Sequence, residues 1–188
     1  YKGYNTDAIG LYRELEEENI IIKDKEVIIL GAGGASNAIT YICADKGAAK
    51  IYLLNRTFDK AKKLADDVNS HFGDVVVPLA ISDYRLIPEG KYPVIQTTSC
   101  GLYPHNDDAP IYDKEFYELV EAGVDIIFNP AKTMFMKLCK ESGARAYNGL
   151  KMLLYQGIAA FELWNDIKVP KNLADKILGM MERKLKES

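Results

Sequence analysis

The apolar run at residues 27–30 leads directly into a glycine-rich loop whose composition suits anion binding. The loop consists of Gly31, Ala32, Gly33, Gly34 and Ala35. Glycine has no Cβ, so the backbone can turn tightly out of a strand and expose its amides to a pyrophosphate. A helix expected over residues 36–45 would point its free N–H groups and positive dipole end at the same anion. The pattern predicts a phosphate cradle. The alternative is an ordinary strand-to-helix loop, because the full fingerprint is G-x-G-x-x-G.

A second polar cluster follows the next apolar run, at residues 50–54. Its members are Asn55, Arg56, Thr57 and Lys60. In dinucleotide-binding units, an acidic residue about 20 positions after the glycines binds the ribose 2′-OH of NAD. Here no acid is present, and a guanidinium and an ammonium could pair with a 2′-phosphate instead. The cluster therefore predicts NADP(H). That these cations merely solvate a helix start is a poorer explanation, because cations are unfavourable at that end of the dipole.

Small hydroxyl residues follow a short apolar run at residues 94–96. Thr97, Thr98 and Ser99 stand where the carboxyl edge of an open α/β sheet holds its ligand, so we expect their backbone to line the cofactor. Cys100 has the chemistry of a nucleophile, but no histidine and asparagine constellation accompanies it, and His105 lies in a polar loop that suits solvent. We assign neither a catalytic role.

Near the N-terminus, Asp7 stands in the first turn of a predicted helix that Asn5 or Thr6 would cap. A carboxylate in a first turn is favoured by the helix dipole, so the spacing alone makes Asp7 a capping residue. The helical periodicity predicts a core-facing side of Ile9, Tyr12 and Leu15 and a water-facing side of Glu14, Glu16, Glu17 and Glu18.

The helix expected over residues 149–164 is unusually apolar. Leu150, Leu153, Leu154 and Phe161 recur on one face. Met152 and Gln156 are four residues apart and share another face, so an uncharged amide projects beside a flexible apolar side chain. The alternative is a core glutamine whose amide is satisfied by the backbone.

Composition excludes several classes of protein. The 188 residues carry a net charge of −3 with acids and bases interspersed, so we expect neither nucleic acid nor a membrane as a partner. Cys43, Cys100 and Cys139 are few, odd in number and without C-x-x-C spacing, which favours a reducing cytoplasm over disulfides and predicts no metal site. No apolar run reaches the roughly 18 residues of a membrane span. Because the chain starts at Tyr1, without Met or a signal peptide, we expect a piece of a longer protein.

Strands and helices alternate along the chain. Besides the elements above, the pattern predicts strands at residues 75–80, 124–128 and 144–147 and helices at 58–72, 113–122, 133–142 and 170–188, with Gly123 ending the helix 113–122. The expected fold is α/β: a Rossmann-like, doubly wound, mostly parallel sheet with helices on both faces and additional C-terminal helices. We expect one domain over residues 1–188, with a linker helix at 1–20, a nucleotide-binding core at 21–147 and C-terminal helices at 148–188.

Five motifs, in this order, resemble the shikimate dehydrogenase family, specifically its NADP-binding portion, over nearly the whole chain. They are G-Y-N-T-D at residues 3–7, G-A-G-G-A-S at 31–36, N-R-T at 55–57 with Lys60, T-T-S-C-G-L at 97–102 and G-L-K-M-L-L-Y-Q at 149–156. Each motif alone is modest, whereas the five together are highly specific. The resemblance implies NADPH-dependent reduction of 3-dehydroshikimate to shikimate, with hydride passing between the nicotinamide and a ring carbon of the substrate.

The resemblance also implies roles for individual residues. Asp7 would pair with a catalytic lysine and hold it and the substrate hydroxyl for proton transfer, which adds a catalytic role to that of a helix cap. Gln156 would bind a substrate hydroxyl. Thr6 and Phe128 would lie at the substrate, and Gly149, Met152 and Ile126 at the cofactor.

The chain departs from the family pattern at two positions. The family commonly has Asn in place of Gln96 and Tyr in place of Phe128, so one substrate hydrogen bond is lost and the choice between shikimate and quinate stays open. The family's N-terminal substrate domain and its catalytic lysine have no match here. We therefore expect this chain to bind cofactor without turnover and to self-associate through the face that the missing domain covers. A freestanding NADP-binding module without chemistry is the remaining alternative.

Overall fold

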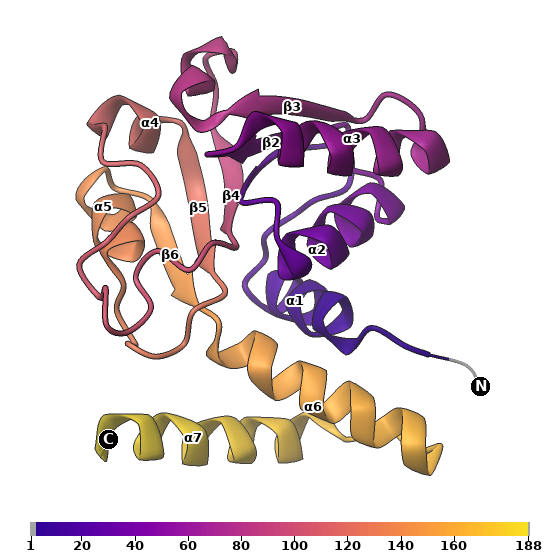
Figure 1. The fold of residues 1–188 in the computed structure, drawn as a ribbon. Coiled ribbons are helices and arrows are strands. Elements are labelled where there is room, and N and C mark those ends of the chain that lie inside the picture. Colours follow the sequence, from indigo (N-terminus) through magenta and orange to yellow (C-terminus); the bar gives the residue numbers. More distant parts are fainter. Residues whose placement is uncertain (1–2, 188) are drawn as a thin grey trace.

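The computed structural model describes residues 3–187, and its framework is a six-stranded parallel sheet within them. The strands are β1 (Glu26–Leu30), β2 (Lys50–Asn55), β3 (Val76–Ala80), β4 (Tyr92–Gln96), β5 (Val120–Asp125) and β6 (Arg145–Asn148). Their order across the sheet is β3-β2-β1-β4-β5-β6, and every pairing is parallel (Figure 1). The predicted doubly wound, Rossmann-like architecture is confirmed.

The helices connect these strands and then continue beyond the sheet. They are α1 (Thr6–Glu17), α2 (Gly34–Asp45), α3 (Phe58–Phe72), the 3₁₀ helix η1 (Ile81–Leu86), α4 (Lys114–Glu118), α5 (Met134–Glu141), α6 (Leu150–Asn165) and α7 (Lys171–Glu187). α2 begins two residues earlier than predicted, because Gly33 takes the N-cap position. The last helix was predicted to reach Ser188, which lies outside the described residues.

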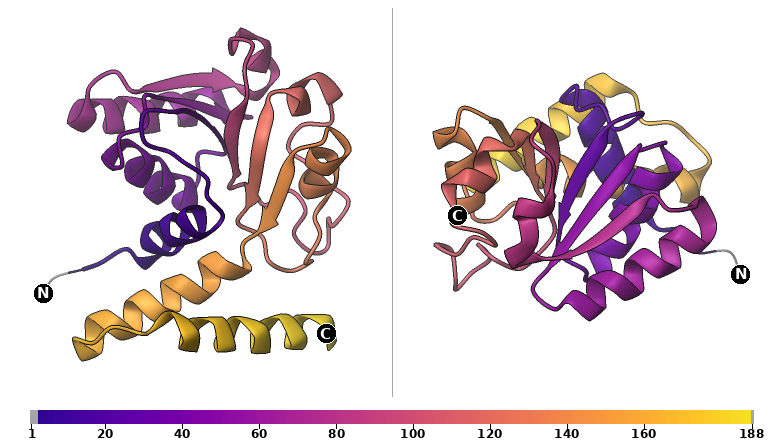
Figure 2. Two further views of the ribbon diagram at one scale, coloured as in Figure 1. Left: turned by 180° about the vertical axis from the view of Figure 1, so that it is seen from behind. Right: turned by 90° about the horizontal axis from the view of Figure 1, so that it is seen from above.

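Helices lie on both faces of the sheet (Figure 2). An apolar layer of side chains fills the space on each face. Val27 and Ile29 of β1 pack with side chains of α1, α2 and α3, whereas Ile28 and Leu30 pack with those of α4 and α5. All four side chains are fully buried. A strand covered on both faces reads as a continuous apolar run, which is why residues 27–30 carry no polar alternation.

The strand order reverses between β1 and β4, and this is where open α/β sheets form their ligand crevice. Leu30 at the end of β1 pairs with Gln96 at the end of β4. Beyond this pair the two strands diverge: β1 continues into the glycine-rich loop, and β4 continues into the loop at residues 97–101. Tertiary pairing thus brings together two motifs that are more than 60 residues apart in the sequence.

α6 leaves the sheet at the end of β6 and crosses α1, and α7 packs against its far side (Figure 1). A small cluster joins α6 and α7, made of Leu154, Tyr155, Ile158 and Ala174. Of the predicted apolar face of α6, Leu150 and Leu154 are buried and Leu153 is half-buried, but Phe161 is 47% exposed. The helix therefore leaves part of its apolar surface uncovered.

The prediction for residues 113–128 is wrong. The helix predicted over 113–122 ends at Glu118, and the strand predicted over 124–128 is instead Val120–Asp125. Gly123 does not end a helix. It lies inside β5, where a Cβ would be 2.7 Å from the Cys139 Sγ and 3.0 Å from the Phe135 ring. The glycine is needed because α5 packs closely on the sheet, a constraint that sequence periodicity does not reveal.

Candidate functional site

The turn after β1 leaves a helix N-terminus open. Gly31 has φ +113°, a conformation that favours glycine, and Ser36 Oγ donates to its carbonyl at 2.5 Å, which ties the start of α2 to the end of β1. Gly33 is the N-cap and offers no capping side chain, and a Cβ built on Gly33 or Gly34 meets nothing within 4 Å. The free amides of the first turn therefore border open space, as an anion site requires. Gly31 is buried, Ala32 and Ala35 are half-buried, and Gly33 and Gly34 between them are exposed.

The neighbouring strand end carries the cationic cluster. Gly31 N donates to the Leu54 carbonyl at 2.7 Å, so the end of β2 lies directly beside the glycine loop. Asn55 Nδ2 donates to the Thr57 carbonyl at 2.8 Å and shapes the turn into α3. Thr57 is the N-cap of α3 without a side-chain capping bond. Arg56 and Lys60 are exposed, and within residues 3–187 neither has an ion-pair partner, so their charges are available to a ligand.

Gln96 holds the loop that follows β4. Its side chain is fully buried; Nε2 donates to the Cys100 carbonyl at 3.1 Å and to Asp125 Oδ1 at 3.3 Å, and Oε1 accepts from Thr98 N. Thr97 Oγ1 donates to the Leu30 carbonyl at 2.7 Å, which binds the start of the same loop to β1. The residue that departs from the family pattern therefore shapes the loop from inside. Thr97 is buried, Thr98 is half-buried and Ser99 is exposed at this edge.

Asp125 is the buried partner of Gln96. It also accepts from Thr133 Oγ1 at 2.6 Å and from Ile127 N at 3.0 Å. Burial raises the pKa of its carboxyl to about 6, and the hydrogen bonds from Thr133, Ile127 and Gln96 oppose that rise. The network connects the loop after β4, the chain after β5 and the start of α5 into one rigid unit.

The chain after β5 meets the start of α6. Ile126 is half-buried and its N–H donates to the Gln96 carbonyl at 3.1 Å, while Phe128 is 37% exposed. Gly149 N donates to the Ile127 carbonyl at 3.1 Å. A Cβ on Gly149 would lie 2.1 Å from the Ile126 carbonyl oxygen, so only glycine fits this crossing.

The predicted substrate residues meet where α1 crosses α6. Thr6 Oγ1 donates to Gln156 Oε1 at 3.5 Å, and Gln156 Nε2 donates to the Leu153 carbonyl at 3.1 Å. Gln156 is half-buried, so part of its amide is satisfied by the backbone and part faces the Thr6 side. Asn5 is the N-cap of α1, with Oδ1 accepting from Asp7 N at 3.0 Å. The Asp7 side chain is exposed beside Thr6, and capping does not occupy its carboxylate.

The predicted site residues thus form two groups along the carboxyl edge. The glycine loop and the Arg56 cluster follow β1 and β2, whereas Ile126, Gly149 and Gln156 lie around the ends of β5 and β6. The loop at residues 97–101 stands between the groups, because β4 separates β1 from β5.

Sequence reasoning missed two residues of the α1–α6 crossing. Glu14 was predicted to face water, which is wrong: it is 1% exposed and Oε2 accepts from Met152 N at 3.0 Å. Gly10 was not singled out, yet a Cβ there would lie 2.6 Å from the Met152 carbonyl oxygen and 2.7 Å from Gln156 N. The four-residue spacing of Thr6, Gly10 and Glu14 was the available signal, because residues four apart share one helix face.

The cysteines and the acidic and histidine side chains offer no second reactive site among the described residues. Cys43 and Cys139 are buried, Cys100 is half-buried, and all three are free thiols. Burial raises the pKa of the Cys43 thiol and that of Cys139, each to about 12, so neither resembles an activated nucleophile. Within residues 3–187 no group of three or more His, Cys, Asp or Glu side chains could hold a metal ion. In the same range no helix has the length and apolarity needed to cross a membrane.

Comparison with known proteins identifies the family. A model described as Shikimate / quinate 5-dehydrogenase matches residues 14–82, and a model of the Shikimate 5'-dehydrogenase C-terminal domain matches residues 149–176. The first range holds the glycine loop and the Arg56 cluster, and the second begins at Gly149. The chain belongs to the shikimate dehydrogenase family. The resemblance carried by the five sequence motifs is therefore confirmed.

Individual members of the shikimate dehydrogenase family agree in sequence and in fold. The Shikimate dehydrogenase (NADP(+)) of Carboxydothermus hydrogenoformans is 38% identical over 178 residues, which are 95% of this chain and 63% of that protein. A chorismate mutase/shikimate 5-dehydrogenase fusion protein from Clostridium acetobutylicum superposes with a TM-score of 0.84 at 32% identity, over 99% of this chain and 63% of the other. A shikimate dehydrogenase crystallised with NADP+ gives a TM-score of 0.79 at 35% identity, over 94% and 61% of the two chains. This chain thus spans less than two thirds of the length of these relatives.

Proposed function

We propose that this chain is the NADP-binding domain of a shikimate dehydrogenase, which reduces 3-dehydroshikimate to shikimate with NADPH and catalyses the reverse reaction. The observation that carries the proposal is the open N-terminus of α2 beside two exposed cations that have no ion-pair partner within residues 3–187. Gly33 and Gly34 leave room for a pyrophosphate, and Arg56 and Lys60 stand at the adjacent strand end. A 2′-phosphate would meet the positive charges of Arg56 and Lys60 there.

The residues present fit NADP(H) along the whole edge. The amides of the glycine loop would hold the pyrophosphate, Arg56, Thr57 and Lys60 the 2′-phosphate, and the backbone of residues 97–99 the middle of the cofactor. Gly149, Ile126 and Met152 would lie near its nicotinamide end. When bound, NADP(H) supplies or accepts the hydride. The chain itself orients the cofactor through the rigid unit of Gln96 and Asp125.

On the substrate side, Asp7 is the proposed catalytic residue of this chain. Its carboxylate is exposed and not used for capping, because Asn5 caps α1. It could therefore accept a hydrogen bond from a lysine ammonium or from a substrate hydroxyl and hold the proton that moves during oxidation and reduction. Thr6 and Gln156 would bind further hydroxyl groups of the substrate.

Completion of the enzyme requires a second domain in this proposal. Since the chain spans 63% of the Carboxydothermus relative, we propose that an upstream substrate domain supplies the catalytic lysine and the groups that bind the substrate carboxylate. Residues 3–187 alone would then bind cofactor without turnover, and exposed apolar side chains such as Phe161 and Trp164 would favour self-association. The cytoplasm is the proposed compartment, consistent with three free thiols.

Quinate is the second candidate substrate, because the matching family model is described as Shikimate / quinate 5-dehydrogenase and because Phe128 lacks a phenol. Quinate has one more hydroxyl than shikimate. Steady-state turnover of the parent enzyme with each substrate decides between them, since a site built for one loses a hydrogen bond or crowds a hydroxyl with the other.

Calorimetric titration of this chain with NADPH and with NADH tests the proposal. We expect NADPH to bind at least about tenfold more tightly, and Arg56→Ala to remove that preference while NADH binding stays unchanged. Lys176→Ala is the control, because it removes one exposed positive charge on α7, which carries none of the predicted cofactor residues. Equal affinity for the two cofactors in the unsubstituted chain would refute the assignment to NADP.

A parent enzyme that binds NADPH but turns over neither shikimate nor quinate would leave only the non-catalytic module. Turnover by residues 3–187 alone would instead show that the base lies within this chain. Asp7→Asn in the parent enzyme should abolish most turnover and leave NADPH affinity nearly unchanged, because Asp7 faces the substrate side. Near-normal turnover of that variant would reduce Asp7 to a first-turn carboxylate without a catalytic role.

A further inference from the structure

α6 begins at a position that cannot carry a capping side chain. Its N-cap is Gly149, where a Cβ would lie 2.1 Å from the carbonyl oxygen of Ile126 and 2.5 Å from the carbonyl carbon. The residues that normally cap helices are Ser, Thr, Asp and Asn, and all of them have a Cβ. The first-turn amides of α6 must therefore find acceptors from outside the helix.

Two side chains from other elements supply those acceptors. Asn148 Oδ1 at the end of β6 accepts from Leu150 N at 3.2 Å. Glu14 Oε2 on α1 accepts from Met152 N at 3.0 Å across a sequence separation of 138. Met152 is the third residue of α6, and its N–H is one that an N-cap side chain ordinarily binds. Glu14 thus performs from another helix the task that Gly149 cannot perform.

The contact belongs to a stripe of residues spaced four apart that faces α6. The stripe consists of Thr6, Gly10 and Glu14 on α1 and Glu18 at its C-cap. Thr6 bonds Gln156, and Gly10 lets the two backbones approach, since a Cβ would strike Met152 and Gln156. Glu18 pairs with Lys151. Every member of the stripe therefore restricts how α6 can slide or rotate on α1.

We propose that Glu14 is a positioning residue for the site: by capping α6 from α1, it sets the register in which Met152 and Gln156 stand relative to Asp7. The inference builds on the function proposed above, because those three residues are its candidate cofactor and substrate contacts. Among the stripe residues, Glu14 alone combines near-complete burial with a hydrogen bond to the backbone of α6. A hydrogen bond to the α6 backbone restricts how far α6 can shift along its own axis relative to α1. Contacts between two side chains restrict this shift less, because both side chains can change rotamer.

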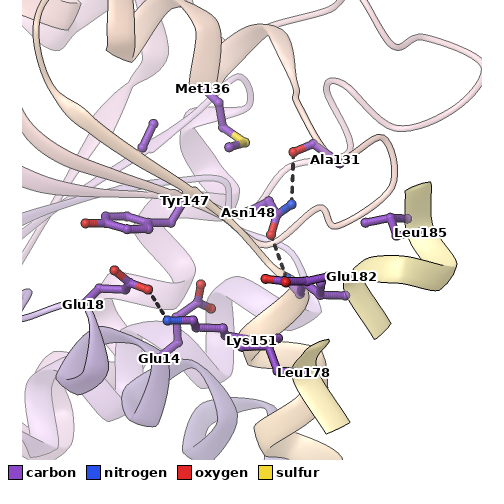
Figure 3. A pocket seen from close by; sticks show the side chains of 12 residues that line it. Glu14, Glu18, Ala131, Met136, Tyr147, Asn148, Lys151, Leu178, Glu182 and Leu185 are labelled. Atoms are coloured by element: carbon purple, nitrogen blue, oxygen red, sulfur yellow. Dashed lines mark hydrogen bonds and ion pairs between the residues drawn. The ribbon is translucent and has the colours of Figure 1, made fainter. Parts of the chain in front are cut away.

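The surroundings of Glu14 make its protonation state measurable. Burial raises the pKa of its carboxyl to about 8, whereas the bond from Met152 N and the charge of Lys151 lower it. Glu14 lines a cavity of about 480 Å³ between α1, β6 and α7 (Figure 3). Among the described residues, the titratable groups around it are Glu17 on α1, Glu18 at its C-cap and Lys151 on α6, together with Tyr147 on β6 and Glu182 on α7, which line the same cavity.

Amide NMR of this chain tests the contact without any ligand. We expect the Met152 N–H resonance to shift with pH, with a midpoint near 8, and to lose that shift in Glu14→Gln, which preserves the shape of the side chain. Glu16→Gln is the control, because it makes the same substitution at an exposed position of the same helix. We also expect Glu14→Ala, which removes the acceptor, to raise the hydrogen-exchange rate of Met152 N–H at least about tenfold over Glu16→Ala. A Met152 resonance and exchange rate that respond equally to substitution at positions 14 and 16 would overturn the proposal.

Turnover in the parent enzyme tests the consequence for the site. We expect Glu14→Ala to lower kcat/KM for shikimate at least about tenfold, Glu14→Gln to restore part of it, and NADPH affinity to change less than threefold. Equal kcat/KM in the Glu14→Ala and Glu16→Ala enzymes would overturn the positioning role. The two proposals fail separately: if the parent enzyme has no turnover but Met152 N–H reports Glu14 as expected, the proposed activity falls and the capping of α6 by Glu14 stands.

Discussion

The two ends of the candidate site are built in different ways. At the β1–β2 end, the groups that could bind the cofactor are backbone amides and exposed side chains within one βαβ segment, and Gly33 and Gly34 border open space. At the α1–α6 crossing, the corresponding groups belong to helices about 140 residues apart. There the glycines are crowded: a Cβ on Gly10 or Gly149 would strike backbone atoms.

The difference shows that glycine has opposite tasks at the two ends. In the loop after β1, its missing side chain leaves room for a ligand, so substitution should affect binding more than folding. At the crossing, the missing side chain is filled by the protein's own backbone, so substitution should affect folding first. Charged side chains differ between the two regions in the same way. Glu14 and Asp125 are buried in packed regions, whereas Arg56 and Lys60 are exposed to solvent.

The largest effect should come from Gly149→Ala. The new Cβ would meet the Ile126 carbonyl group, which extends β5 and cannot move aside, so we expect the free energy of unfolding to fall by at least about 3 kcal/mol. Gly157→Ala in the same helix is the matched control. A Cβ there meets nothing within 4 Å, so we expect it to stabilise the protein by up to about 1 kcal/mol. Urea denaturation measures both, and similar values for the two variants would contradict the crowded crossing.

Asp125→Asn should change how stability depends on pH. Because burial raises the pKa of Asp125 to about 6, the folded protein binds more protons than the unfolded chain between about pH 4 and pH 6. Stability of the unsubstituted protein relative to the variant should therefore fall as pH rises through that window, by roughly 3 kcal/mol at about 1.4 kcal/mol per pKa unit.

The control for this pH dependence is Asp113→Asn. A hydrogen bond from Tyr84 keeps the pKa of Asp113 below its usual range, so its contribution has the opposite sign and is lost as pH falls. Urea denaturation at pH 4 and pH 7 compares the two variants. A difference of the same sign for both would show that Asp125 is not stabilised in its protonated form.

Thr6→Val should have a smaller effect. The substitution removes one partly buried hydrogen bond to Gln156 and preserves the branched shape, so we expect a loss of no more than about 1 kcal/mol. Thr57→Val at the other end of the site is the matched substitution, and since Thr57 makes no side-chain capping bond, stability should change by less than about 0.5 kcal/mol. Thermal unfolding measures the stability of both variants. A larger loss of stability for Thr57→Val than for Thr6→Val would contradict the expectation that the α1–α6 crossing contributes more to folding than the β1–β2 end.

The smallest effect on stability should follow from Arg56→Ala and Lys60→Ala. Both side chains are exposed, and within the described residues neither has an ion-pair partner, so we expect changes within about 0.5 kcal/mol. Thermal unfolding without ligand measures this. Substantial destabilisation by either substitution would mean that these cations hold the fold together and are not reserved for a ligand.

The elements predicted from the sequence and those observed differ mainly where local pattern and tertiary packing conflict. The helix at residues 58–72 was predicted to the residue, because its amphipathic pattern is long and its end has a glycine, Gly73. The prediction for residues 113–128 was wrong because a glycine after an apolar helical pattern usually marks the end of a helix. Gly123 instead lies in β5, where it makes room for Cys139 and Phe135. No local pattern distinguishes these two uses of glycine.

Within the site, motif reading selected Thr6, Gln156, Met152 and Gly149, and the structure places them around one crossing. It misjudged Glu14, because a run of glutamates at residues 16–18 made the neighbouring carboxylate look like part of a solvated face. Only packing against α6 shows that this glutamate is buried and bonded to the backbone of Met152.

The sequence by itself determined the α/β fold and the family and was enough to propose the cofactor end of the site, because these depend on periodicity and on motifs whose residues are neighbours in the chain. Tertiary structure alone decided the other end. The acceptor for the Met152 amide, the glycines required at positions 10 and 149 and the buried pair Gln96–Asp125 all depend on atoms from distant segments meeting within hydrogen-bonding or van der Waals distance. Those distances are set by how α1, α6 and the sheet pack, and the free energy of such contacts appears only once the chain has closed on itself.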